Sequence, residues 1–318
     1  MTIQSELTYP DRVDPDIRRF VDLVNAAYAE HATGDPADLA GRRRIAERVR
    51  ERWRAGGPAM HEVRDFAAAG LRMRLYLPKA QPRLPAMIYV HGGGWTLFSI
   101  DTHDRLMREY AARAGVAVIG FDYSLSPEHK YPVALEEVAG GIDWVLGDAD
   151  RLGIDPARVL IGGDSAGANL SVTASLLRRE RGRPPLAGMV LNYGAFDPEP
   201  TESYDRYGGA AFPLSVDEMD DFWANYVTAP AQLRDPLVAP LRADLAGLPP
   251  TFVAIAECDI LAGCNRAFAH KLAAAGVAVE AITYRGATHS FLEAVSIAPL
   301  AARAIEDQAT WIRSIVGG

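Results

Sequence analysis

The stretch VLIGGDSAGANL, residues 159–170, sets the architecture of the chain. Its first residues, 159–161, form a short apolar run typical of a buried strand, and a helical pattern follows over 166–180. Between them, Gly163–Gly167 form the pattern G-x-S-x-G. A serine at the centre of a sharp strand-to-helix turn is exposed, and glycines on either side leave room for the turn. The pattern therefore predicts Ser165 as a nucleophile, beside the free N–H groups of a helix N-terminus.

A second glycine-rich turn lies upstream in AMIYVHGGGWTLF, residues 86–98, where an apolar run ends on His91 and three glycines follow. Acyl transfer builds negative charge on a carbonyl oxygen, and fixed backbone N–H groups that stabilise it are each worth roughly 100- to 1000-fold in rate. We expect such an oxyanion hole to be formed by the N–H groups of Gly93, Gly94 and Ala166, the last because it follows the nucleophile.

The glycine run and His91 each allow another interpretation. A dinucleotide-binding loop would need its third glycine where Leu97 stands, and a phosphate-binding loop would need a following Lys-Ser or Lys-Thr pair. A tight turn with no catalytic role remains the alternative for the glycines. His91 could act as a base, but it precedes the nucleophile in the chain, and we expect it to hold the loop instead.

Strands and helices alternate over most of the chain, which predicts an α/β fold with a mostly parallel central sheet and helices on both faces. A hairpin at Gly70 is expected to join the first two strands. We expect strands over residues 63–68, 71–77, 86–90, 116–121, 159–161, 188–191, 251–256 and 279–284, and helices over 104–114, 132–146, 166–180, 262–275 and 297–315.

Two segments stand outside this alternation. Residues 1–55 carry two helical patterns, over about 16–32 and 36–54, and the stretch 194–240 has no clear strand but holds an aromatic helix near 217–227. An insertion this long is usually functional. We expect both segments to form a helical cap over the strand ends of a catalytic domain at 56–318.

A catalytic serine needs a base and an acid, which follow it in the order acid, then histidine. His289 comes just after the last expected strand, whereas His270 lies inside a helix, so we expect His289 to be the base. Asp259 lies just after the preceding strand and is our choice for the acid, with Glu257 as the near alternative.

Composition excludes several classes of protein. The 318 residues include 33 basic and 41 acidic ones, a net charge of −8, which argues against a nucleic-acid partner. No apolar run has the length of a membrane span, and the polar N-terminus does not resemble a secretory signal. Cys258 and Cys264 are the only cysteines, which rules out a disulfide framework and favours reduced thiols in the cytoplasm.

Several motifs together resemble the hormone-sensitive-lipase family of α/β-hydrolases from about residue 61 onward: HGGGW at 91–95, DYSLSPEHKYPVALEE at 122–137, GDSAG at 163–167, Asp259 and His289. The stretch IDTHDRLMREYA at 100–111, with DYSLSPE, resembles the bacterial acetyl esterases within that family. The resemblance implies an α/β-hydrolase fold, a serine carboxylesterase for short-chain esters, no metal and no cofactor, and either a monomer or a homodimer.

The chain departs from the family pattern at three places. Ser124 and Ser126 stand where the family has arginine and alanine, Ile260 follows the acid where proline is usual, and Ser290 follows the base where glycine is usual. None of these departures removes a catalytic group, but the second affects local support of the base and the third affects its loop.

The sequence thus favours hydrolysis of small carboxylic esters without fixing the leaving group. An amidase, a lactonase or a metabolite deacetylase would use the same residues, and a non-catalytic small-molecule receptor on this fold would be expected to lack the base or the nucleophile. We expect bulky side chains beside Ser165 to restrict the acyl chain: Trp95, Leu97, Phe98, Tyr193, Phe212 and Trp223.

Overall fold

In the computed structural model, which describes residues 12–32 and 38–317, eight strands form one sheet in the order β1-β2-β4-β3-β5-β6-β7-β8. The strands are β1 Glu62–Ala68, β2 Leu71–Leu77, β3 Leu84–Val90, β4 Ala117–Asp122, β5 Ile154–Asp164, β6 Gly188–Asn192, β7 Thr251–Cys258 and β8 Val279–Thr288. Strand β2 runs antiparallel to both neighbours, and all other pairs are parallel. This is the mostly parallel sheet that the alternating pattern predicted.

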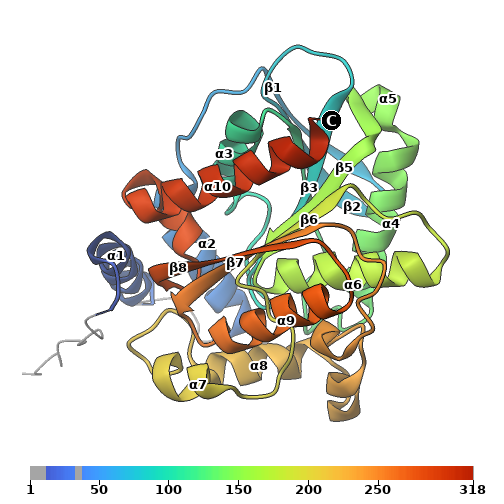
Figure 1. Ribbon diagram of the computed structural model, residues 1–318. Coiled ribbons are helices and arrows are strands. Elements are labelled where there is room, and N and C mark those ends of the chain that lie inside the picture. Colours follow the sequence, from blue (N-terminus) through green and yellow to red (C-terminus); the bar gives the residue numbers. More distant parts are fainter. Residues whose placement is uncertain (1–11, 33–37, 318) are drawn as a thin grey trace, which may run out of the picture.

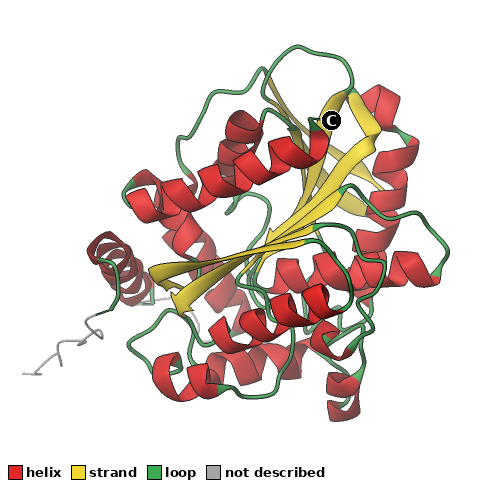
Figure 2. Ribbon diagram, viewed as in Figure 1, coloured by secondary structure: helices red, strands yellow, loops and turns green. Residues whose placement is uncertain are grey.

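Helices cover both faces of the sheet (Figures 1 and 2). Helices α3 (Asp104–Ala114) and α10 (Pro299–Val316) pack on one face, and α4 (Val133–Gly147), α6 (Ala166–Glu180) and α9 (Ala262–Ala274) pack on the other. Alternate residues of β3 therefore enter two separate cores: Ile88 and Val90 face one, Met87 and Tyr89 the other. Burial on both faces explains why the central strands are continuous apolar runs.

Element boundaries differ from the expected ones mainly at two strands. Strand β5 begins five residues early because Ile154 pairs with Leu84 before a register shift leads into the main ladder. Strand β8 continues to Thr288 and so carries the chain directly to His289. The hairpin forms as expected, with Ala68 paired to Leu71 and both Ala69 and Gly70 at positive φ.

The two segments outside the alternation are helical. Helix α1 (Pro15–His31) is capped by Asp14 and α2 (Leu39–Arg54) by Asp38, whereas the expected start of the second helix at residue 36 lies outside the described residues. The insertion holds α7 (Glu202–Tyr207), α8 (Val216–Tyr226) and two short turns, η1 (Pro230–Arg234) and η2 (Pro240–Arg242). The remaining elements are α5 (Ala149–Leu152) and η3 (Phe291–Ser296). We call α1, α2 and α8 the cap helices.

Within residues 12–32 and 38–317, no helix combines the length and the apolar character that crossing a membrane requires.

Candidate active site

Ser165 occupies the turn between β5 and α6. Its backbone has φ 52° and ψ −117°, a conformation that non-glycine residues rarely adopt, and its N–H donates to the Asn192 carbonyl at 2.9 Å. A Cβ atom at either Gly163 or Gly167 would collide with the carbonyl oxygen of Val90. The two glycines of the motif are therefore needed because β3 passes directly against the turn.

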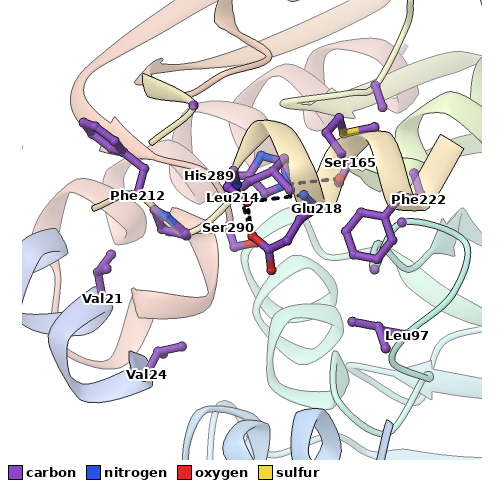
Figure 3. Close-up of a pocket in the computed structure, with 18 of the residues that line it drawn as sticks. Val21, Val24, Leu97, Ser165, Phe212, Leu214, Glu218, Phe222, His289 and Ser290 are labelled. Carbon is purple, nitrogen blue, oxygen red and sulfur yellow. Dashed lines mark hydrogen bonds between the residues drawn. The ribbon is translucent and has the colours of Figure 1, made fainter. Parts of the chain in front are cut away.

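Three side chains from distant parts of the chain meet at this turn, and Figure 3 shows two of them, Ser165 and His289. His289 Nε2 lies 3.0 Å from Ser165 Oγ, and His289 Nδ1 lies 2.8 Å from Asp259 Oδ2. The second oxygen of Asp259 accepts the N–H of Leu261 at 3.0 Å. All three side chains are buried, Asp259 almost completely. The carboxylate thus holds one ring nitrogen and leaves the other facing the hydroxyl.

The imidazole of His289 is electrostatically tuned by this contact. Burial alone would lower its pKa, but the charge of Asp259 and the hydrogen bond to it outweigh burial and raise the pKa above its ordinary value. Asp164 and Glu293 act in the same direction. The site therefore favours the protonated imidazole that forms when a base takes a proton from the serine.

The alternatives to these residues lie elsewhere. His270 is exposed on α9. Glu257 accepts the N–H of Gly286 at 2.9 Å and approaches Arg12 at 4.0 Å, so its carboxylate is used in holding β8. The structure brings His289 and Asp259 to Ser165, and it brings neither alternative there.

The three-glycine loop lies against the same turn. Gly93 and Gly94 have φ of 110° and 59°, and both line one cavity together with Ser165 and Ala166. Among the described residues, no oxygen accepts a hydrogen bond from the N–H of Gly93 or Gly94. A Cβ at Gly94 would collide with the ring of Phe222, which explains why a side chain is absent there.

Asp164 ties this loop to the nucleophile turn, a role that the sequence did not reveal. Its Oδ1 accepts the N–H of Gly92 at 3.1 Å and the hydroxyl of Tyr89 at 2.7 Å, and His103 Nε2 lies 3.4 Å away. Burial would raise the pKa of this carboxyl, but the charge and hydrogen bond of His103 and the Tyr89 hydroxyl hold it below its usual range. A carboxylate is thus retained directly beneath the two glycine-rich turns.

His91 holds the loop, as expected, and does not contact the serine. Its Nδ1 lies 2.7 Å from the Gly92 carbonyl, its ring stacks on Tyr123, and the Tyr123 hydroxyl donates to the His91 carbonyl at 3.0 Å. Burial, with the neighbouring His103, lowers the pKa of His91 to about 4. A ring that stays neutral can pack in this interior position.

The structure accommodates the departures from the family pattern. Ser290, directly after His289, adopts φ 60°, the left-handed region that a glycine would occupy more easily. Asp259 accepts the Leu261 N–H with Ile260 at the position where the family has proline. Ser124 donates from its backbone N–H and its hydroxyl to Glu137, at 2.7 and 2.6 Å.

A cavity of about 590 Å³ opens onto Ser165 and His289. Of the expected lining residues, Trp95, Leu97, Phe98 and Phe212 lie on its wall, whereas the expectation for Tyr193 and Trp223 is wrong. Tyr193 is buried under the catalytic site with its ring 5.1 Å from that of His289, and Trp223 packs on Trp95 at 4.6 Å. Both aromatics support the wall from behind.

Residues of the cap helices complete the wall and were not expected from the sequence. Phe20, Val21 and Val24 come from α1, and Met219 and Phe222 come from α8. Their helical spacing was visible as an apolar face, but only the fold shows what that face covers. Figure 3 shows Val21, Val24, Leu97 and Phe222 around the space in front of Ser165 and His289.

Comparison with known proteins agrees with this geometry. Residues 87–293 match the family described as alpha/beta hydrolase fold. The carboxylesterase NlhH of Mycobacterium tuberculosis is 37% identical over 242 residues, which cover 73% of this chain and 74% of that protein. An acetyl esterase of Salmonella choleraesuis is 31% identical over 315 residues, 94% of this chain and 96% of that protein.

A solved structure is similar over almost the whole chain. The hyperthermophilic esterase from Pyrobaculum calidifontis superposes with a TM-score of 0.90 at 32% identity, covering 96% of this chain and 100% of the other. The family match agrees with the fold, and the relatives and the solved structure are all named esterases. The chain belongs to the α/β-hydrolase family, in its hormone-sensitive-lipase branch of carboxylesterases and acetyl esterases, and is a carboxylic ester hydrolase.

Proposed function

We propose that the enzyme hydrolyses short-chain carboxylic esters through a triad of Ser165, His289 and Asp259. The observation that carries the proposal is the imidazole of His289, which lies within hydrogen-bond distance of both the serine hydroxyl and the carboxylate. Nucleophile, base and orienting acid in this chain of contacts are what serine-based acyl transfer requires.

The chemistry follows from these contacts. Ser165 Oγ attacks the ester carbonyl while His289 Nε2 takes its proton, and Asp259 stabilises the imidazolium. The developing oxyanion is stabilised by the N–H groups of Gly93, Gly94 and Ala166. His289 then returns the proton to the leaving alcohol, and water hydrolyses the acyl-enzyme by the reverse sequence of proton transfers.

The cap is assigned to residues 1–55 and 194–240. Its helices α1, α2 and α8 line one side of the cavity, and the catalytic domain at 56–318, apart from the insertion at 194–240, lines the other. A covered site excludes water from the reacting groups, which strengthens the electrostatic interactions inside it.

Two observations support a preference for short acyl chains. Bulky side chains lie next to the nucleophile, and one of the relatives is an acetyl esterase. We expect p-nitrophenyl esters from acetate to dodecanoate to show their highest kcat/KM at acetate to hexanoate. Steady-state rates across this series test the proposal, and a maximum at octanoate or longer would contradict it. A parallel panel of amides and acetylated sugars identifies the leaving group.

Activity should fall in mild acid. The base must be neutral in the free enzyme, and the pKa of His289 is raised above its ordinary value of 6.5, so the acidic limb of kcat/KM should have its midpoint above that value. A profile from about pH 5 to 9 on p-nitrophenyl acetate measures this midpoint. A midpoint well below 6.5 would mean that Asp259 does not raise the pKa of His289.

A further inference from the structure

The end of the cavity formed by α1 and α2 is polar, unlike the wall next to it. Phe20, Val21 and Val24 give this part of the wall its apolar side chains, and Asn25, Tyr28 and Arg50 give it its polar ones. In Figure 3, Val21 and Val24 extend from α1 toward the space in front of Ser165 and His289. Ser165 and these polar groups line one cavity of about 590 Å³, so an ester bound at Ser165 has room to extend toward them.

Arg50 is the fixed element of this end. It is only 6% exposed, and its guanidinium lies 4.5 Å from the centre of the Phe98 ring. Its Nε lies 2.6 Å from one carboxylate oxygen of Glu293, and its Nη2 donates to the other at 3.4 Å. Glu293 thus neutralises one edge of the guanidinium and leaves the Nη1 edge for other partners.

The Nη1 edge is only partly used within the described part of the chain. Nη1 donates to the Tyr28 hydroxyl at 3.2 Å, and the guanidinium carries two protons on this nitrogen. Because the Tyr28 oxygen accepts that bond, its own proton can be donated elsewhere. Both groups line the cavity, so the polar end offers hydrogen-bond donors held in place by buried contacts.

Charge decides which acceptor suits these donors. Glu293 already balances Arg50, and Asp217 and Glu218 lie on the α8 side of the same cavity, so a carboxylate would meet repulsion. An alkyl chain would desolvate the donors without replacing their hydrogen bonds, which is unfavourable. A neutral oxygen, such as a ketone, ether or second ester carbonyl, meets neither penalty.

We propose that this end of the cavity selects esters that carry a second, uncharged oxygen acceptor, recognised by Arg50 and Tyr28. The inference rests on the proposed function, since it concerns substrates that react at Ser165. It adds specificity at a place remote from the reacting bond.

Matched ester pairs test the selection. One arm compares p-nitrophenyl esters of keto acids with those of alkanoic acids of equal chain length, and the other compares acetates of keto alcohols with alkyl acetates. In one of the two arms, and at the chain length that places the keto oxygen beside Arg50 and Tyr28, we expect the keto ester to have a kcat/KM roughly three- to tenfold higher than the matched alkyl ester. This is the effect of one hydrogen bond to a neutral group. The arm that responds shows whether the acyl or the alcohol part occupies this end.

Tyr28→Phe removes one donor without touching the Arg50–Glu293 pair, and it should lower the keto-to-alkyl ratio. Arg50→Lys keeps the positive charge but removes the planar set of guanidinium N–H donors, and it should also lower the keto-to-alkyl ratio. Tyr131→Phe is the matched control, because its hydroxyl donates to Asp235 at 2.9 Å, outside the cavity lining, and it should leave the ratio unchanged.

The outcomes separate the two proposals. If the wild-type enzyme hydrolyses none of these esters, the proposed function fails. If it hydrolyses them with a keto-to-alkyl ratio of one at every length in both arms, the function stands and this inference is overturned. A ratio that survives both Tyr28→Phe and Arg50→Lys also overturns it.

Discussion

Replacement of Ser165 by alanine is expected to lower kcat for p-nitrophenyl acetate about a millionfold, because the triad acts as a unit and its loss removes the acyl-enzyme route. The serine hydroxyl contacts His289 Nε2 at 3.0 Å. The substitution keeps the Cβ atom and should leave the fold intact.

The matched control is Ser175→Ala on the same helix, α6, where the lost hydroxyl donates to the Ser171 carbonyl at 2.8 Å. It should retain wild-type kcat. Circular dichroism and thermal melting of both variants show that they are folded. A Ser165→Ala enzyme that keeps more than a hundredth of the wild-type kcat would contradict the assignment.

Replacement of Asp259 by asparagine is expected to lower kcat about ten-thousandfold through the wrong imidazole tautomer. Asp259 Oδ1 accepts the Leu261 N–H, so an asparagine would keep its carbonyl oxygen on that side and turn its NH₂ toward His289 Nδ1. Nδ1 would then accept a hydrogen bond from the amide rather than donate one, so the single ring proton would lie on Nε2. A protonated Nε2 cannot take the serine proton.

Glu257→Gln is the control for this variant, since it makes the same chemical change two residues away at a group that holds Gly286. Its kcat should stay within about threefold of wild type, because the Glu257 side chain does not contact the reacting groups. Steady-state kinetics on purified proteins measure both. If Glu257→Gln showed the larger loss, the acid would be Glu257 and the contact seen for Asp259 would not be the functional one.

The sequence was sufficient to predict the fold class and the residues that meet at Ser165. Parallel strands end at one edge of a sheet, so residues just after successive strands converge even when they are far apart in the chain. Ser165, Asp259 and His289 each follow a strand. The G-x-S-x-G motif and the order of acid and histidine after it indicated all three, with Glu257 left open as the alternative to Asp259.

The rest depended on contacts that periodicity does not encode. Tyr193 and Trp223 look like wall residues in the sequence but support the wall from behind, because neighbouring aromatic rings take the positions in front. The Arg50–Glu293 pair joins residues 243 positions apart, and an arginine-rich helix gave no sign of which arginine is buried. Asp164 stands at a variable position of the G-x-S-x-G motif, so the pattern gave no sign of its contacts with the glycine loop.

The most direct test of the account is to react the enzyme with a fluorophosphonate probe, digest it and locate the adduct by mass spectrometry. The account predicts a single adduct on the Ser165 peptide, which disappears in Ser165→Ala and is strongly reduced in His289→Ala. An enzyme that hydrolyses p-nitrophenyl acetate while the adduct forms on another residue would contradict it.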